Sequence, residues 1–297
     1  MKNKIIAPIF LPIFIDSCST ATAGQLATGS AKECLEGVTT RLVLAKTSFR
    51  FTDLNDFKDT ASWEAAIVSK DLVPLFGVYE VTSADTEAVK YESGNFSAVT
   101  KKEIKKVTTE SYLSICSHRA LKSYENSGYT QVFEVTENGE ILGVYDADGV
   151  QVKGQDITEF EVAIRQRATN DKVPYSMVTI TFRDFDEFED NGIVAKPSWD
   201  ANSINGIFGL TLEIQGTPSS TEIQVKAFVG CGAELYEDLV LGDWLFSGGT
   251  IDGSTYSSVT GIYTLTGTGL VSGNLGTNGV VTTGTVNVEA INTAVTI

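Results

Sequence analysis

The sequence is poor in the residues that carry most catalytic and metal chemistry. His118 is the only histidine, and Cys18, Cys34, Cys116 and Cys231 form no CxxC pair. A zinc site needs clustered cysteine and histidine ligands, so this pattern argues against one. No glycine-rich phosphate loop stands between a predicted strand and a predicted helix. These absences favour a protein that is not an enzyme and holds no cofactor or metal.

The scattered cysteines do not form the pattern of a disulfide scaffold in a chain of 297 residues. We therefore expect mostly small, buried apolar cysteines and folding under reducing conditions, with a Cys18–Cys34 pair left open. His118 lies two residues from Cys116 in a predicted helix, so the two side chains do not share a face. We expect His118 to be solvated or to lie in an interface.

Basic residues are scarce as well. The chain has 22 lysines and arginines against 38 acidic residues, for a net charge of −16. Gripping nucleic acid requires clustered positive charge, so such binding is not expected. A surface past which nucleic acid slides without sticking remains compatible with this charge. The basic patch Lys101, Lys102, Lys105 and Lys106 is a candidate contact with an acidic partner, and a solvated charged face is the alternative.

The sequence has no apolar run long enough to cross a bilayer. The longest, Ile5–Ile15, is shorter than the roughly 20 residues that a spanning helix needs. It follows a short basic start, and Ile15–Cys18 imitates a lipid-attachment box. A signal peptide whose cleavage leaves a lipid on Cys18 is therefore one interpretation.

Two features of this segment favour a retained arm that packs on the body or on a neighbouring copy. Pro8 and Pro12 interrupt a run that a signal peptide needs as a helix. Asp16 places a charge beside the cleavage point. No membrane anchor is then expected. The candidate assembly contacts in the arm are the apolar residues Ile5, Ile6, Phe10, Leu11 and Phe14.

The densest charge cluster is acidic and alternates with aromatic residues. It comprises Asp184, Asp186, Glu187, Glu189 and Asp190. Hard divalent cations take carboxylate oxygens. The spacing does not match the helix–loop–helix calcium pattern, because Phe188 stands where an oxygen ligand is needed. We expect a solvated acidic loop anchored by its aromatic residues, with a cation site as the alternative.

Two-residue periodicity dominates the chain, and few helices accompany it. Asn138-Gly139, between the strand patterns Gln131–Thr136 and Glu140–Tyr145, is a strong type I′ hairpin pattern. Helical patterns are confined to Thr60–Lys70 and Thr109–Tyr124. The sequence therefore predicts a mainly β protein, an antiparallel sandwich or barrel with one or two short helices.

Composition divides the chain into three segments. Residues 1–33 form the arm, residues 34–216 a β domain, and residues 217–297 a smaller second domain. The boundary is a turn-rich stretch that begins at Gly216. Short strands between Gly, Thr and Ser turns in the last segment predict an immunoglobulin-like β-sandwich with Trp244 in its core.

Residues 34–216 resemble phage tail tube proteins, in particular those of tailed phages that infect Bacteroidota. Cys34–Val38 followed by Arg41–Ala45 is similar to the opening tube strand after a short Cys/Gly segment. The polar stretch Lys90–Val107 stands where tube subunits have an extended loop that reaches their neighbours. One helix, Thr109–Tyr124, then precedes antiparallel strands. The last domain is similar to the immunoglobulin-like appendages of virion proteins.

The resemblance implies a bacteriophage structural protein, with the tail tube subunit as the leading hypothesis. Such subunits form rings, usually hexameric, whose inner strands join into a continuous β-barrel, and the rings stack into a pipe. A negative lumen lets DNA pass during ejection without specific binding. The expected partners are further copies and other tail proteins. The expected location is the virion, assembled in the host cytoplasm.

Other classes remain open. Many tube proteins lack such a C-terminal domain, so a sheath, head-decoration or baseplate protein is a further hypothesis. A cell-surface lipoprotein or adhesin would account for Ile15–Cys18 and for the Ser/Thr/Gly-rich last segment. An enzyme acting on polysaccharide would need a carboxylate pair across a cleft, which no pattern in the sequence provides.

Overall fold

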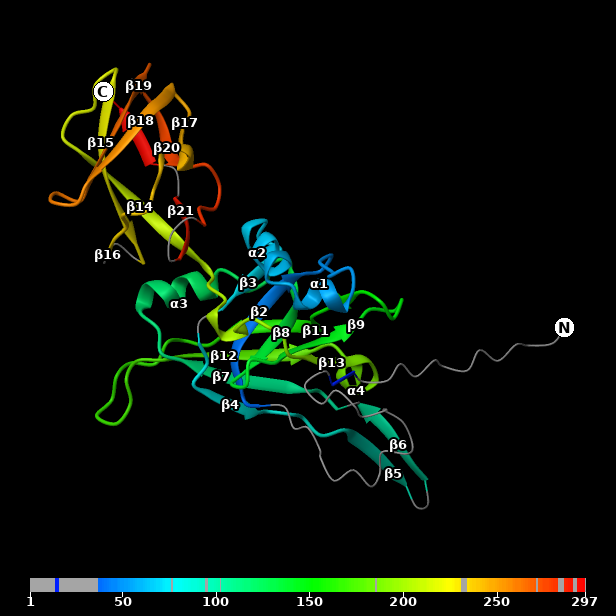
Figure 1. Ribbon diagram of the computed structural model, residues 1–297. Helices are drawn as coiled ribbons and strands as arrows, with labels where there is room; N and C mark the ends of the chain where they lie inside the picture. The colour runs from blue at the N-terminus through cyan, green and yellow to red at the C-terminus, as the bar shows by residue number, and fades with distance from the viewer. Residues whose placement is uncertain are drawn as a thin grey trace. The chain divides into compact units, whose positions relative to one another are not determined.

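The computed structural model divides the chain into two compact units, Met1–Ile204 and Asn205–Ile297 (Figure 1). It describes residues 14–15, 37–75, 77–93, 96–101, 103–184, 186–230, 234–270, 272–282, 286–290 and 293–296. Both units consist mainly of antiparallel strands, which confirms the predicted mainly β class. Within these ranges, no helix has the length and apolar character needed to cross a membrane.

The first unit is built on one large sheet, part of which curls into a half-barrel. Its strands follow the order β1 (Phe14–Ile15), β13 (Gly192–Ala195), β9 (Ile141–Tyr145), β8 (Tyr129–Thr136), β11 (Gln155–Val162), β12 (Ser176–Phe182), β7 (Lys106–Ser111) and β4 (Glu80–Ser83). Strand β2 (Thr39–Lys46) pairs with β8 and with β3 (Leu72–Pro74), and β10 (Val152–Lys153) pairs with β9.

Strand β11 belongs to two parts of this sheet. Its first residues, Gln155 and Asp156, pair with β8, whereas Glu159–Val162 pair with β12 beyond a bulge. The sheet therefore turns at β11, and the β2–β8 part packs on the β11–β12 part through a shared apolar core. This core comprises Leu42, Leu44, Leu75, Leu113, Leu121, Val132, Ile157, Phe160, Val162, Val178, Ile180 and Phe182.

Helices α1 (Leu54–Lys58) and α2 (Thr60–Val68) pack on the other face of the β2–β8 part. The carboxylate of Asp53 caps α1 by accepting hydrogen bonds from two amides of its first turn. Phe57 and Trp63 pack on Phe133 of β8, with ring centroids 5.7 and 5.3 Å apart from it. The predicted helix at Thr60–Lys70 is confirmed.

The expectation of one helix over Thr109–Tyr124 is wrong in its first third. Helix α3 covers only Ile115–Lys122, and the residues up to Ser111 belong to β7, which pairs with β12 along its length. β-branched residues favour that strand. Ser114 starts the helix, because its hydroxyl accepts a hydrogen bond from the Ser117 amide at 3.1 Å.

The second unit is a sandwich of two sheets. One sheet follows the order β18 (Thr250–Ser257), β19 (Ile262–Thr268), β15 (Glu222–Val229), β14 (Ile207–Gln215) and β21 (Asn287–Ala290), with β16 (Glu234–Leu235) beside β15. The other follows β17 (Trp244–Phe246), β20 (Ser272–Thr277) and β22 (Thr293–Thr296).

Apart from β16 and β21, which add to the edges of the larger sheet, this strand order is that of a constant-type immunoglobulin domain. With β14 as strand A, the sheets contain strands A, B, E and D on one side and C, F and G on the other. Trp244 lies on the strand C position, is buried, and packs edge-on against Tyr263 with ring centroids 5.3 Å apart. The immunoglobulin-like prediction and the core position of Trp244 are confirmed.

The boundary between the units lies at Ile204 and not at Gly216. Strand β14 pairs with β15 and β21, and its Leu210 and Leu212 lie in the second core. Gly216, at a φ of +69°, begins the connection between β14 and β15. A turn within a hairpin and a linker between domains share the same composition, so composition alone misplaced the boundary.

Candidate functional site

The β11–β12–β7–β4 part of the sheet has a polar outer face. Strand alternation turns residues such as Phe160, Val178 and Ile180 into the shared core, so their neighbours point outward. The cross-strand register places the outward residues in rows: Glu159 and Glu161 on β11, Met177, Thr179 and Thr181 on β12, Lys106, Thr108 and Glu110 on β7, and Glu80 and Thr82 on β4. Except for Met177, these residues are threonines or charged residues.

Hydrogen bonds and ion pairs link the rows of this polar face. The hydroxyls of Thr108 and Thr179 lie 3.3 Å apart. Lys172, from the loop after β11, places Nζ 2.9 Å from Glu110 and 3.8 Å from Glu80. In the described part of the chain, no lysine or arginine is within ion-pair distance of Glu159 or Glu161. The β11 side of the face therefore carries uncompensated negative charge.

A two-stranded hairpin extends from the β4–β7 end of this face (Figure 1). Strands β5 (Val89–Ser93) and β6 (Phe96–Lys101) pair with each other, and the bridge between Thr86 and Ile104 joins them to β4 and β7. The polar stretch Lys90–Val107 is thus a hairpin and the strand that follows it. Tyr91 is 57% exposed, and Lys90 is exposed beside it.

The four lysines of the predicted basic patch do not share one environment. Lys105 Nζ lies 5.5 Å from the ring centroid of Phe182 and 5.9 Å from that of Phe188, a cation–π arrangement within the first unit. Lys106 points to the polar face. Lys101 belongs to β6, its side chain outside the described atoms, and Lys102 lies outside the described residues.

The expected acidic loop is a short helix, α4 (Glu187–Asn191). Glu187 accepts a hydrogen bond from Lys153 Nζ at 2.7 Å and another from the Asp156 amide at 2.8 Å. The side chain of Lys153 is only 8% exposed, so Glu187 anchors α4 to the sheet. The remaining acidic residues, Asp184, Asp186, Glu189 and Asp190, are exposed. No three potential ligand residues are placed to hold a metal ion in the ranges described above.

His118 and Ser176 resemble a nucleophile and its base, but the pair is buried. His118 Nδ1 lies 2.9 Å from Ser176 Oγ, and Ser176 is 0% exposed. A nucleophile must reach its substrate, so this contact ties α3 to β12 instead. Burial, and after it the positive charges of Lys122 and Arg165, lower the pKa of His118. The expectation of a solvated or interface histidine is wrong.

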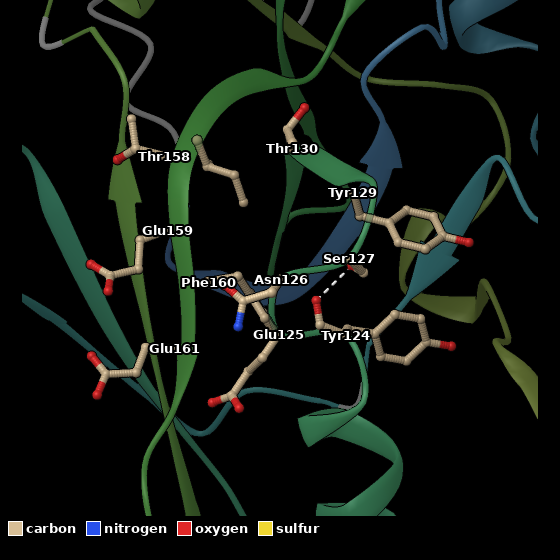
Figure 2. Close-up of a pocket in the computed structure, with 11 residues that line it drawn as sticks. Tyr124, Glu125, Asn126, Ser127, Tyr129, Thr130, Thr158, Glu159, Phe160 and Glu161 are labelled. Carbon is tan, nitrogen blue, oxygen red and sulfur yellow. Dashed lines mark hydrogen bonds between the residues drawn. The ribbon is translucent and has the colours of Figure 1, made fainter.

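A hollow of about 500 Å³ opens beside the polar face, where β8 and β11 separate (Figure 2). Its wall comprises Tyr124, Glu125, Asn126 and Ser127 after α3, Tyr129 and Thr130 of β8, and Ile157, Thr158, Glu159, Phe160 and Glu161 of β11. Glu125 reaches across the hollow to β11, where its Oε1 accepts a hydrogen bond from the Val162 amide at 2.7 Å. No motif or spacing in the sequence marks this hollow.

The tyrosines of the hollow form its other side. The rings of Tyr124 and Tyr129 pack edge to face, with centroids 5.6 Å apart. Tyr129 donates its hydroxyl proton to the Lys70 carbonyl at 2.8 Å, and burial raises the pKa of both phenols. The hollow thus combines neutral aromatic rings with the carboxylates of Glu125, Glu159 and Glu161.

Only the end of the expected arm is described. Phe14 and Ile15 form β1, which pairs in parallel with Ile193 and Val194 of the buried strand β13. The side chain of Phe14 and the other candidate contacts in the arm, Ile5, Ile6, Phe10 and Leu11, lie outside the described part.

The expectation of reduced, buried cysteines is wrong for Cys116. It is exposed in the first turn of α3 and forms a disulfide whose partner lies outside the described residues. Disulfides persist in oxidising compartments, so folding under reducing conditions no longer follows from the cysteine pattern.

The surface described above extends over the polar face, the hairpin and the hollow. The Ser176–His118 pair, in contrast, is buried and closed to substrate. Such a surface suits contacts between macromolecules. The chain matches no family model, no curated protein and no solved structure.

Proposed function

We propose that the chain is a virion structural protein, the subunit of a phage tail tube, which assembles into stacked rings around a channel for DNA. The observation that carries the proposal is the polar outer face of the β11–β12–β7–β4 part, with Glu159 and Glu161 on one side. A sheet face of threonines and carboxylates stays wet when copies assemble, so it suits the wall of an aqueous channel.

The charge of this face supports the role of a channel wall. Glu159 and Glu161 are exposed and lack a cation partner in the described part, so they repel phosphates. Proteins that hold DNA do the opposite and neutralise phosphates with lysine and arginine. DNA would therefore pass this wall without binding to it.

The edges of the same part of the sheet support assembly into rings. Among the described strands, β4 pairs only with β7, and β11 leaves β8 after Asp156. Open edges accept strands from other chains. A head-to-tail contact between two different surfaces closes into a ring when its rotation permits. Hexameric rings, other tail proteins as partners and a location in the virion belong to this proposal.

The second unit fits the proposal as an appendage. It has its own core, formed by residues such as Leu210, Val225 and Leu275. Its folding therefore does not depend on the polar face.

Electron microscopy of the purified full-length protein tests the proposal. We expect rings or tubes of uniform diameter above a threshold concentration. A variant in which residues 88–103 are replaced by a short Gly/Ser turn is the matched control, because it removes the hairpin and leaves the core intact. It should keep the cooperative thermal unfolding of the wild type and lose tubes. Monomers of the wild type at high concentration, even beside the other tail proteins, would contradict the proposal.

The disulfide of Cys116 favours a second candidate, a cell-surface lipoprotein or adhesin, because such proteins fold in oxidising compartments. The mass of the intact protein from its native source separates the two candidates. Loss of residues 1–17 together with a lipid adduct on Cys18 would support the lipoprotein.

A further inference from the structure

We propose that a cavity of the second unit binds an alkylammonium group, as carried by a lysine side chain or by a free polyamine. The cavity has a volume of about 530 Å³, a size typical of sites for small ligands. Its described wall belongs wholly to the second unit. The inference therefore goes beyond the proposed channel and does not use the polar face of the first unit.

The floor of the cavity is an uncovered end of the second core. Strand alternation and pairing turn Phe208 of β14 and Val229 of β15 to the same side as the buried Leu210. Phe208, Val229 and Val286, which precedes β21, pack against this core and are only half-buried. The sandwich thus leaves apolar surface open in the cavity, and an apolar part of a ligand gains free energy by covering it.

Carboxylates form the rim of the cavity. Glu234 of β16 and the two residues Glu237 and Asp238 beyond it line the cavity and are exposed. Among the described residues, no lysine or arginine lies within ion-pair distance of any of them. Residues 205–297 contain eight acidic residues and one basic residue, Lys226, which alternation along β15 turns to the outer face of the sheet. The rim therefore carries uncompensated negative charge beside an apolar floor.

Tyr236 adds a hydroxyl group to the wall. The residue is only 5% exposed, and its hydroxyl donates a long hydrogen bond, of 3.4 Å, to the Val286 carbonyl. The phenolic oxygen can also accept a hydrogen bond from a ligand. An ammonium group donates three hydrogen bonds and accepts none, so it matches a wall of carboxylates and a hydroxyl acceptor.

The arrangement selects an organic cation over a metal ion or an anion. In the part of the chain that the structure describes, no three potential ligand residues are placed to hold a metal ion, so the rim acids do not converge on one small ion. Anions are repelled by the rim. An aliphatic amine satisfies both parts of the cavity at once, because its stem covers the floor while its charged head reaches the carboxylates.

Saturation-transfer NMR on the full-length protein, at about 50 mM salt where screening is weak, tests the site. The amine probes are N-acetyl-lysine N-methylamide, for a lysine side chain, and cadaverine, for a free polyamine. Their uncharged counterparts are N-acetyl-norleucine N-methylamide and 1-pentanol. We expect saturation transfer to the methylene groups of at least one amine, and binding weaker by about tenfold or more for its counterpart.

The two amines distinguish the sources of the ligand. A tighter lysine probe assigns the site to a partner protein, and tighter cadaverine assigns it to a free polyamine, so either result supports the proposal. No transfer to either amine, or equal transfer to the uncharged counterparts, would overturn it. These outcomes are independent of whether the protein forms tubes.

Neutral substitutions separate the cavity from general charge attraction. Glu234→Gln with Glu237→Gln and Asp238→Asn should weaken amine binding by about tenfold or more. The matched control, which should bind like the wild type, neutralises three acidic residues of the same unit that do not line the cavity: Glu213→Gln, Glu222→Gln and Asp252→Asn. Both variants should keep cooperative thermal unfolding. Equal weakening in the two would overturn the site, because the attraction would then come from the charge of the whole unit.

The length of the amine tests the floor. From ethylammonium to pentylammonium, affinity should rise by up to about fourfold with each added methylene, because each one covers more of the apolar surface. An affinity that stays constant along the series would show that the stem does not lie on Phe208, Val229 and Val286, and the proposed seat would be wrong.

Discussion

Phe133 is the centre of the aromatic packing between β8 and the first two helices. It is fully buried, and its ring centroid lies 5.8 Å from that of Phe51, 5.7 Å from Phe57 and 5.3 Å from Trp63. We expect Phe133→Ala to lower the free energy of unfolding by about 3–5 kcal/mol, because it leaves a cavity among these rings. Urea unfolding measures the loss. Ile164→Ala, at an 81% exposed site, is the control, and an equal loss there would contradict the assignment.

Lys153 holds two carboxylates below the surface. Its Nζ lies 2.7 Å from Glu187 and 3.0 Å from Asp156. Lys153→Met leaves the largely buried Glu187 without its cation, whereas Asp156 keeps the more distant Arg183 at 3.8 Å. We therefore expect the free energy of unfolding to fall by about 3 kcal/mol. Lys46→Met breaks the half-exposed pair with Asp71 and should lose under about 1 kcal/mol. Equal losses in the two variants, measured by urea unfolding, would show that burial does not matter here.

His118 gives stability a pH dependence that one substitution can isolate, because it is the only histidine of the chain. Its pKa in the folded protein is lowered by burial first and by Lys122 and Arg165 next, against a smaller opposing effect of Glu125. The unfolded chain therefore binds the proton at a higher pH than the folded protein does, so stability falls as pH drops below about 7. Thermal unfolding between about pH 7.5 and 5.5 should show a smaller fall in Tm for His118→Gln than for the wild type. Parallel curves would contradict the shift.

At the level of elements, Gly154 permits the close approach of the β10–β11 segment to β8. A Cβ at this position would lie 2.9 Å from the backbone N, C and O atoms of Val132. Gly154→Ala must push two strands apart, so we expect a loss of about 1–3 kcal/mol in the free energy of unfolding. Gly209→Ala in β14 has no atom within 4 Å of the added carbon and serves as the control. Equal stabilities of the two variants in thermal unfolding would contradict the close approach.

Elements whose cause lies within a few residues are predictable from the sequence. The hairpin at Asn138-Gly139 is present, and Gly139 takes a φ of +73°. The predicted type I′ turn is wrong, because Asn138 does not share that positive φ. Helix α2 follows from its buried stripe around Trp63. The start of α3 is not local. Thr108 belongs to a strand because it pairs with Thr179, which lies 71 positions along the chain. Helical periodicity at Thr109 cannot reveal a partner at that separation.

The candidate site was predictable only where its features depend on residues close together in the sequence. The polar, lysine-rich stretch Lys90–Val107 is visible in the sequence, but the pairing of β5 with β6 within it is a finding of the structure. The polar face depends on the register of β11, β12, β7 and β4, which alternation within each strand does not specify. The hollow joins Tyr124–Thr130 to Ile157–Glu161, and no spacing rule connects those two segments.

For the whole molecule, the division at Ile204 predicts which fragment folds. Residues 205–297 retain β14 with Leu210 and Leu212, whereas residues 217–297 lose strand A and both of its pairings. We expect cooperative thermal unfolding for the longer fragment and none for the shorter one, measured by circular dichroism. A cooperatively folded 217–297 fragment would move the boundary back to Gly216.

Strand β11 is shared by the two parts of the large sheet, because its first residues pair with β8 and its last residues pair with β12. The core between the two parts takes Leu42 and Val132 from one part and Phe160 and Ile180 from the other. Neither part can therefore keep its core without the other. A cut in the backbone between them would leave two pieces that stay together as long as that core stays closed.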